Sequence, residues 1–193
     1  MGPRLLGRRA APGRMTSVAV DQTEFRSVLG HFCTGVTVVT GRDGDTLAGF
    51  ACQSFAALSL DPPLVLFCPA RTSRTWPVLA AAGRFAVNVL AEDQQEVSAV
   101  FGARGEDKFA RFGWTPAPSG APLLDGALTW IDCALEAVHE AGDHYVVIGR
   151  VTALGAPSDA RPLLFHRGRY AVTEPARDAL AAMLPWPRPD DWL

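Results

Sequence analysis

The sequence has few of the features that mark membrane, secreted or nucleic-acid-binding proteins. None of its apolar runs approaches the ~20 residues that a membrane-spanning helix needs. The apolar core of a secretory signal peptide is missing as well. The formal net charge is -2 at pH 7, whereas nucleic-acid-binding domains usually carry a basic face. We therefore expect a cytoplasmic protein whose partners include neither a membrane nor a nucleic acid.

Cysteine is scarce and widely spaced. The four thiols, at Cys33, Cys52, Cys68 and Cys133, form no C-x-x-C pair, and with the four histidines they make no zinc-ligand spacing. Each lies in an apolar stretch, which predicts buried thiols in a reducing compartment. We expect no metal site.

The common nucleotide and hydrolase motifs are also absent. No G-x-G-x-x-G follows a strand, no G-x-x-x-x-G-K-[ST] is present, and no G-x-S-x-G forms a nucleophile elbow. The sequence therefore indicates neither the dinucleotide-binding fold nor a P-loop. Any bound nucleotide must be held by another geometry.

Length and pattern predict one folded domain between two tails. A chain of 193 residues suits one domain. We predict that residues 1–20, which begin with a basic stretch, form an unstructured leader, with Met15 as an alternative start. The folded domain is expected over 21–174. A tail over 175–193 is predicted to hold one helix, 177–184, before a proline-rich end.

Hydrophobic periodicity predicts a first helix over 22–32, opened by a capping box from Asp21 to Glu24. Behind it, β-branched and apolar segments alternate with Gly, Pro and Asp turns. Asp132 and Glu136 alternate with apolar neighbours and are assigned to the solvent face of a strand. The predicted strands are 36–40, 47–52, 55–60, 64–68, 85–90, 127–138, 145–154 and 163–172, with helices over 76–82 and 92–101 and a long irregular connection over 102–126.

The order of these elements has no regular alternation of strand and helix. A parallel doubly wound sheet is therefore not indicated. We predict a mainly antiparallel α+β fold, a Greek-key β-barrel with helices packed outside it.

Two polar segments have residue types suited to holding a ligand. The first is Cys52-Gln53-Ser54, which leads by a short apolar step to Ser59. The second is Arg71-Thr72-Ser73-Arg74-Thr75, directly before the helix predicted at 76. Guanidinium and hydroxyl groups before a helix suit a phosphate, but a solvated turn with a capping Ser or Thr explains them equally well.

Eight segments match a known family when they are taken in order. They are TGVTVVT at 34–40, GFACQSF at 49–55, SLDPPLV at 59–65, SRTW at 73–76, FAVNVL at 85–90, DKF at 107–109, GDH at 142–144 and PLLFHRGRY at 162–170. Together they resemble the flavin reductase-like family with the FMN-binding split barrel, over roughly residues 22–174.

This resemblance implies a homodimeric, antiparallel split barrel that binds FMN or FAD without a covalent bond. Similar members are reductase components that oxidise NADH or NADPH and hand the reduced flavin to a separate flavin-dependent monooxygenase. Hydride passes from nicotinamide C4 to flavin N5, and the cofactor supplies the reactive electronics. The protein then needs to stack two rings and to donate hydrogen bonds to the flavin N1–O2 edge.

The resemblance also implies roles for individual residues. Segment 52–54 is expected at the flavin ring edge, although its middle residue is Gln where Asn often precedes the Ser. Ser59, Ser73 and Arg74 are expected to hold the ribityl phosphate, and Tyr170 is expected near the ring. The cofactor-binding residues implied in this way are Thr34, Gly35, Cys52, Gln53, Ser54, Ser59, Arg71, Ser73, Arg74, Thr75 and Tyr170.

His144 is the implied catalytic residue, because it ends the Gly-Asp-His segment on the expected nicotinamide side. Its imidazole can donate a hydrogen bond to the nicotinamide carboxamide or to a pyrophosphate oxygen without ionising. His31 and His139 are predicted to be surface or helix-end residues. His166 is assigned with equal weight to cofactor contact and to solvent.

Two other functions remain open at this point. One is an oxidase of the pyridoxamine-phosphate type, which would want more basic residues for a second phosphate than Arg71 and Arg74 supply. The other is a flavin-binding module without turnover.

Overall fold

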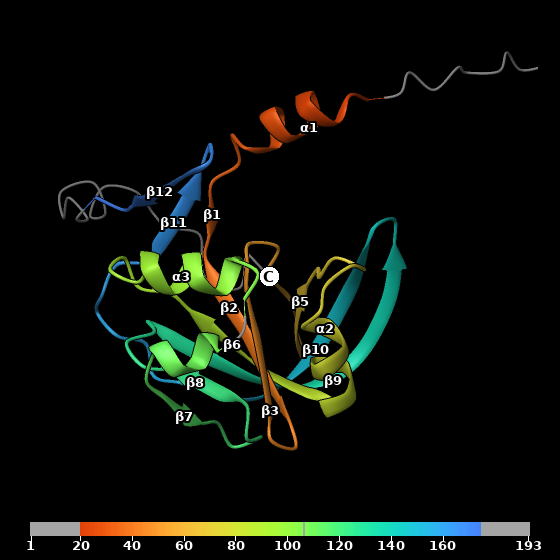
Figure 1. Ribbon diagram of the computed structural model, residues 1–193, viewed down its shortest axis with the longest axis vertical. Helices are drawn as coiled ribbons and strands as arrows, with labels where there is room; N and C mark the ends of the chain where they lie inside the picture. The colour runs from red at the N-terminus through yellow and green to blue at the C-terminus, as the bar shows by residue number, and fades with distance from the viewer. Residues whose placement is uncertain (1–19, 106, 175–193) are drawn as a thin grey trace, which may run out of the picture.

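The computed structural model describes residues 20–105 and 107–174, which Figure 1 shows as a coloured ribbon. The predicted leader, apart from its last residue, and the predicted tail helix over 177–184 lie outside these ranges. No helix within the described ranges is long and apolar enough to cross a membrane.

The first element, α1, is Gln22–Leu29, and it stands off from the rest of the domain (Figure 1). The Asp21 carboxylate accepts two backbone N–H groups of the first turn, each at 2.9 Å, which confirms Asp21 as the N-cap of the predicted capping box. The helix ends earlier than predicted. The backbone N–H groups of His31 and Phe32 bond three residues back, so a tighter turn replaces the last part of the expected helix.

Seven strands form the main sheet, and every pairing between them is antiparallel, as predicted. The sheet curls but stays open, because its edge strands β3 and β4 share no ladder, so the expected barrel is not closed. The strands, in their order across the sheet, are β3 (Thr46–Cys52), β2 (Thr37–Asp43), β6 (Arg84–Val89), β9 (Thr129–Ala141), β10 (His144–Leu154), β5 (Pro63–Phe67) and β4 (Ala56–Leu60).

Two regions are more structured than the sequence predicted. The expected strand 163–172 is a hairpin, because Arg167 and Gly168 take positive φ angles of 50° and 78° and turn the chain back. The expected irregular connection 102–126 contains a 3-10 helix and a short hairpin. The elements are β11 (Leu163–His166) and β12 (Arg169–Val172), which join β1 (Thr34–Gly35) in a three-stranded sheet, and η1 (Lys108–Arg111), β7 (Trp114–Pro116) and β8 (Pro122–Leu124).

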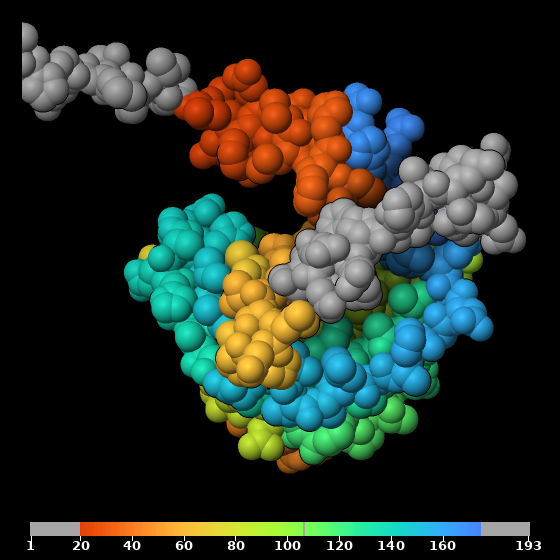
Figure 2. Space-filling model, turned by 180° about the vertical axis from the view of Figure 1, so that it is seen from behind, coloured from red at the N-terminus to blue at the C-terminus, as the bar shows by residue number. Residues whose placement is uncertain are grey.

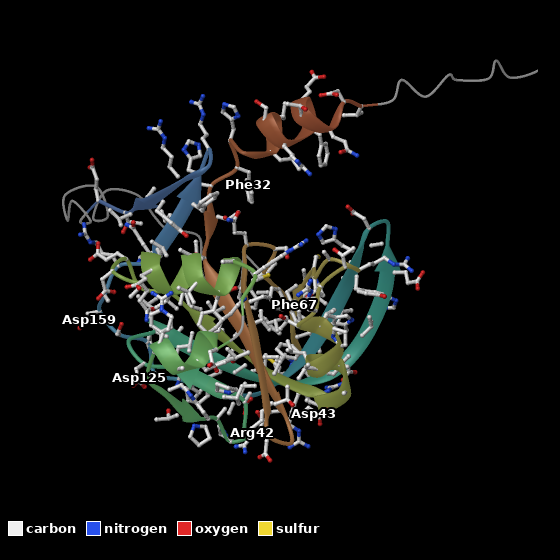
Figure 3. The ribbon with its side chains drawn as sticks, viewed as in Figure 1. Phe32, Arg42, Asp43, Phe67, Asp125 and Asp159 are labelled. Atoms are coloured by element: carbon white, nitrogen blue, oxygen red, sulfur yellow. The ribbon has the colours of Figure 1, made fainter. Side chains whose placement is uncertain are left out.

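The core lies on both faces of β2. Val38 and Val39 are consecutive residues, so their side chains point to opposite faces, and both are fully buried. On one face Val39 belongs to a cluster with Phe67, labelled in Figure 3, and with helix α2 (Trp76–Ala82). On the other face Val38 joins a cluster that includes helix α3 (Gln95–Gly102), which begins later than predicted.

The assignment of Asp132 to a solvent face was wrong. Its side chain is 1% exposed, and its carboxylate accepts a hydrogen bond from the Ser119 backbone N–H at 2.9 Å. The backbone N–H of Ser119, in the loop between β7 and β8, therefore gives the buried Asp132 carboxylate a hydrogen-bond partner. Glu136 is exposed as predicted, and its carboxylate pairs with Arg150 at 2.7 Å.

The four cysteines are not all buried, contrary to prediction. Cys52 and Cys133 are buried, Cys68 is half-buried, and Cys33 is exposed in the turn after α1. Burial, together with the negative charge of Asp132, raises the pKa of the Cys133 thiol to about 12.

Candidate functional site

A cleft of about 560 Å³, here called the inner cleft, opens where β3 and β5 end. This volume lies in the usual range for small-molecule sites, roughly 300–1,000 Å³. Five of the predicted site residues line it: Cys52, Gln53, Ser54, Ser73 and His144. The other lining residues are Phe50, Ala51, Cys68, Pro69, Ala70, Phe101 and Gly102.

Ser54 fixes the position of the two strand ends. Its hydroxyl oxygen accepts the Cys68 backbone N–H at 2.9 Å and lies 3.3 Å from the Cys52 sulfur. Burial raises the pKa of the Cys52 thiol, so this group stays a neutral thiol near pH 7. Ser54 and Cys52 therefore shape the wall of the inner cleft. Hydrogen bonds to a ligand in the cleft must come from neighbouring groups.

Gln53 is the side chain best placed to donate into the inner cleft. It is exposed, and its carbonyl oxygen accepts a hydrogen bond from the Thr34 hydroxyl at 3.5 Å. This contact directs the amide nitrogen, which has two N–H donors, away from Thr34. Gly35 follows Thr34 in β1, where it pairs with Leu164.

His144 begins β10, directly after a turn in which Gly142 has a φ of 62°. Its Nδ1 lies 2.8 Å from a carboxylate oxygen of Asp143. This hydrogen bond, with the nearby imidazole charge, lowers the pKa of Asp143, so the carboxylate is ionised at neutral pH and can only accept. A neutral His144 ring then carries its proton on Nδ1. Its Nε2 is therefore a hydrogen-bond acceptor, whereas we had expected a donor.

The segment before α2, residues 71–75, makes contacts in two directions. The Ser73 hydroxyl accepts the backbone N–H groups of Thr75 at 3.3 Å and Trp76 at 3.2 Å, so it holds the turn that leads into the helix, whose N-cap is Thr75. Arg71 pairs with Glu140 at 3.4 Å and lies over the Tyr145 ring, which directs it to the β9–β10 hairpin. Ser73 thus has a structural contact in this turn, no side chain caps the helix at its N-cap Thr75, and a phosphate role for the segment stays a prediction.

A second cleft of about 460 Å³, here called the outer cleft, adjoins the inner one. Arg74 and Thr75, both predicted site residues, line it together with Lys108. Sequence reasoning used Lys108 for the family resemblance but did not assign it to the site. Its uniqueness was an available signal, because it is the only lysine in the sequence.

Five predicted residues line neither cleft: Thr34, Gly35, Ser59, Arg71 and Tyr170. Ser59 belongs to the edge strand β4 and lines neither cleft among the described residues. Tyr170, in β12, donates its hydroxyl hydrogen to Ser98 at 3.0 Å and packs its ring against Phe165. The proposed contacts of Ser59 with phosphate and of Tyr170 with the ring stay predictions.

Comparison with known proteins identifies the family. The model of the flavin reductase like domain matches residues 29–174. The chain belongs to this family. It is 53% identical, over 94% of this chain and 96% of the relative, to HsaB, the reductase subunit of a flavin-dependent monooxygenase of Rhodococcus jostii.

Solved structures of the flavin reductase family agree with this fold. Nitrilotriacetate monooxygenase component B from Mycobacterium thermoresistibile is 54% identical, with a TM-score of 0.78 over 84% of this chain and 96% of that one. The NADH:FAD oxidoreductase SgcE6 of Streptomyces globisporus, solved with NAD and FAD fragments, is 36% identical, with a TM-score of 0.78 over 82% and 96% of the two chains.

The residues of the inner cleft fit a flavin. Its wall carries the apolar groups of Phe50, Ala51 and Phe101, which suit the face of a planar ring system. Gln53 supplies amide donors for a ring edge on which negative charge grows during reduction. The cleft therefore offers an apolar face and a polar edge.

Proposed function

We propose that this protein is an NAD(P)H:flavin oxidoreductase, the reductase component of a two-component flavin-dependent monooxygenase. The inner cleft carries this conclusion, because it combines a flavin-sized space with His144 at its rim, in a chain of the flavin reductase family. FMN or FAD is the flavin, and NADH or NADPH is the reductant.

A flavin held in the inner cleft would supply the hydride acceptor for a nicotinamide reductant. Gln53 donates hydrogen bonds to the edge of the ring where negative charge develops. His144, with its proton held toward Asp143, accepts the N–H of the nicotinamide carboxamide at Nε2 and orients that ring. Since hydride transfer removes no proton from carbon, the site needs no general base.

Arg74 is proposed as the ligand of the ribityl phosphate. It directly follows Ser73, a residue of the inner cleft, and stands where the inner cleft meets the outer one. Because a charge-assisted hydrogen bond contributes about 1.5–3 kcal/mol, Arg74→Ala should weaken FMN about ten- to a hundredfold. Riboflavin, which has no phosphate, is the control. Equal weakening of both flavins would mean that Arg74 acts through the fold.

Two copies of the chain are proposed to associate through α1. No residue of this helix is buried, and the segment exposes large apolar side chains, among them Phe25 at 55% and Phe32 at 76%. Figure 2 shows a hollow between α1 and the β9–β10 hairpin. A groove of about 510 Å³ beside the helix is lined by Phe32 and also by Gln53 and Ser54, so a covering copy would border the inner cleft.

Light scattering tests the association. A mass near twice 20.6 kDa is expected, and Phe32→Ser should shift it toward the monomer. A wild-type mass near 20.6 kDa in dilute solution would contradict the dimer.

The rate of NADH oxidation with added free flavin tests the main proposal. Turnover that rises with added FMN or FAD supports the reductase, and addition of the partner oxygenase should consume the reduced flavin. Turnover that requires an amine would instead indicate the oxidase, and binding without turnover would indicate a storage module. The relatives named as monooxygenase reductase components give no support to either alternative.

A further inference from the structure

The turn of the β11–β12 hairpin is rich in basic residues. The four residues at this turn are His166, Arg167, Gly168 and Arg169. Three of these four are basic, whereas the whole chain has a formal net charge of -2. Figure 3 shows side chains with nitrogen ends projecting from this corner of the molecule, beside the end of α1. The hairpin therefore concentrates basic groups in a chain that is acidic overall.

The two faces of the hairpin differ in chemistry. Phe165 lies directly opposite Tyr170, and their rings pack together in the core cluster that includes α3. His166 lies opposite Arg169, one residue further along each strand, so this pair points to the other face. The His31 ring, just after α1, lies beside the His166 ring, with 6.4 Å between the centroids. The surface formed by His31, His166, Arg167 and Arg169 is here called the basic face.

The arginines of the basic face have no acidic partner in the part of the chain that the structure describes. Neither Arg167 nor Arg169 forms an ion pair there, and both residues are exposed. A hollow of about 520 Å³ against this face is lined by residues 166, 167 and 169–171, none of which is acidic. On the β9–β10 hairpin, by contrast, Arg150 pairs with Glu136 at 2.7 Å. The basic face therefore keeps its positive charge available to a partner.

This arrangement is not the one that hairpin stability favours. Two-residue turns with positive φ at both positions prefer Asn-Gly, whereas Arg167 occupies the first position here with a φ of 50°. Directly opposite residues stabilise a strand pair when their charges are opposite, but His166 and Arg169 are both basic. Departures from such local rules concentrate at functional sites. The hairpin therefore points to a role in binding an anionic partner.

The basic face gives a small anion little enclosure. Sites for small molecules bury about 70–90% of the ligand surface, which requires walls on more than one side. The described residues that line the 520 Å³ hollow all come from one hairpin. A protein partner supplies the opposite wall itself, and complementary charge steers its approach and selects it. The face thus fits an acidic protein surface better than a free phosphate or nucleotide.

The basic face lies next to the opening of the inner cleft. Arg167 also lines the groove beside α1, and that groove reaches Gln53 and Ser54, which line the inner cleft. Phe165 lines the same groove, so a second copy seated there contacts the side of the hairpin opposite to Arg169. A partner on the basic face therefore stands close to the flavin site without competing for the proposed dimer contact.

We propose that the basic face docks the oxygenase component, through an acidic surface of that protein, beside the opening of the inner cleft. The inference rests on the proposed function, which makes an oxygenase the consumer of the reduced flavin. Arg169 carries the main attraction, because it points to the outward face and is unpaired among the described residues. Docking shortens the path of reduced flavin through solvent, where dioxygen converts it to oxidised flavin and hydrogen peroxide.

Binding of an oxygenase to the immobilised full chain, measured by surface plasmon resonance, tests the proposal. The probe is the oxygenase subunit of the Rhodococcus jostii monooxygenase whose reductase subunit, HsaB, is 53% identical to this chain. Arg169→Glu should raise the Kd about two- to thirtyfold, because an exposed ion pair contributes up to about fivefold and charge reversal adds a repulsion of similar size. Salt raised from about 0.05 to 0.5 M should weaken wild-type binding too. Absence of wild-type binding at low salt, or binding that salt does not weaken, would overturn the proposal.

Arg84→Glu is the matched control. Arg84 is also an exposed arginine without an ion pair in the described ranges, but it begins β6 and lines neither the hollow nor the groove. It makes the same change in net charge, so the Kd should stay at the wild-type value. Arg169→Lys keeps the positive charge and should restore most of the binding. An equal loss in both glutamate variants would mean that net charge alone drives association, which contradicts a docking surface on the hairpin.

NADH oxidation without the oxygenase separates docking from the binding of a small anion. The KM values of NADH and FMN should be the same in Arg169→Glu and in the wild type, because Arg169 lines neither cleft among the described residues. A raised KM for either compound would place a small anion on the hairpin and overturn the inference. Oxygenase binding by a wild-type chain that oxidises no NADH with any flavin would remove the proposed function alone. NADH oxidation without oxygenase binding would remove the docking surface alone.

Discussion

Replacement of His144 by alanine is the most direct test of how the site binds and orients NADH. The ring is placed by two local features, the turn at Gly142 and the 2.8 Å hydrogen bond from Nδ1 to Asp143. His144 lines the inner cleft, and a neutral ring with its proton on Nδ1 has Nε2 as a hydrogen-bond acceptor. Since a neutral hydrogen bond contributes about 0.5–1.5 kcal/mol, His144→Ala should raise the KM of NADH about two- to thirteenfold.

The assay must separate the reductant from the flavin. Steady-state NADH oxidation with saturating FMN gives the KM, stopped-flow reduction of the flavin-loaded protein gives the hydride-transfer rate, and fluorescence quenching gives the Kd of oxidised FMN. We expect the first two to worsen and the flavin Kd to stay near its wild-type value. His144→Gln should recover part of the loss, because its amide oxygen can accept the same hydrogen bond.

His139→Ala is the matched control, since His139 is an exposed histidine on the same hairpin, opposite Val146. It should change nothing. Wild-type rates and a wild-type NADH dependence in His144→Ala would mean that the histidine is structural, and a flavin Kd weakened as much as the KM would refute its assignment to the nicotinamide side.

Three further predictions concern the fold and its thiols. Asn88→Ala removes donors to the carbonyl oxygens of Val38 and Pro122 and an acceptor for Leu124 N–H at 2.8 Å, so it should cost about 2–4 kcal/mol in urea unfolding, because buried groups are left without partners. Gly149→Ala places a methyl group against the Phe85 ring and should cost about 1–3 kcal/mol by the same assay, with the open Gly35→Ala as its control for the loss of a glycine. At pH 8 a thiol reagent should modify exposed Cys33 first and leave Cys133, with its pKa of about 12, unreacted until the protein unfolds; early labelling of Cys133 would contradict its burial.

Local sequence signals predicted most of the strand pattern, because β-branched runs and their turns are short-range features. They failed where a single residue changes the chain direction. The hairpin of β11 and β12 depends on Arg167 at a φ of 50°, an unusual conformation for a residue other than glycine, so the pattern indicated one continuous strand. Asp132 was misplaced for a different reason. Its partner Ser119 lies in a distant loop, and alternation along a strand says nothing about what covers the polar face.

The sequence predicted which segments form the site, but it did not predict how their side chains are arranged and hydrogen-bonded. The residues of segment 52–54, Ser73 and His144 do line one cleft, although they lie far apart in the sequence. The sequence could not predict the hydrogen-bond partners of each side chain. The Ser73 hydroxyl oxygen accepts two backbone N–H groups of the turn before α2, and the Nδ1 of His144 lies against the Asp143 carboxylate, and neither contact could be read from the residue type.

The strand β3 links the structure to the proposed chemistry. Its neighbour β2 pairs with it on one side, and its other edge pairs with no strand among the described residues, so residues along its length line the inner and outer clefts. Gly49 stands at the junction of the clefts, where a Cβ atom would lie 2.7 Å from the Phe101 ring and 3.1 Å from Phe109. The absence of a side chain at Gly49 thus lets Phe101 and Phe109 pack against β3. Phe101 in turn fixes the Lys108 ammonium at the outer cleft through its carbonyl oxygen.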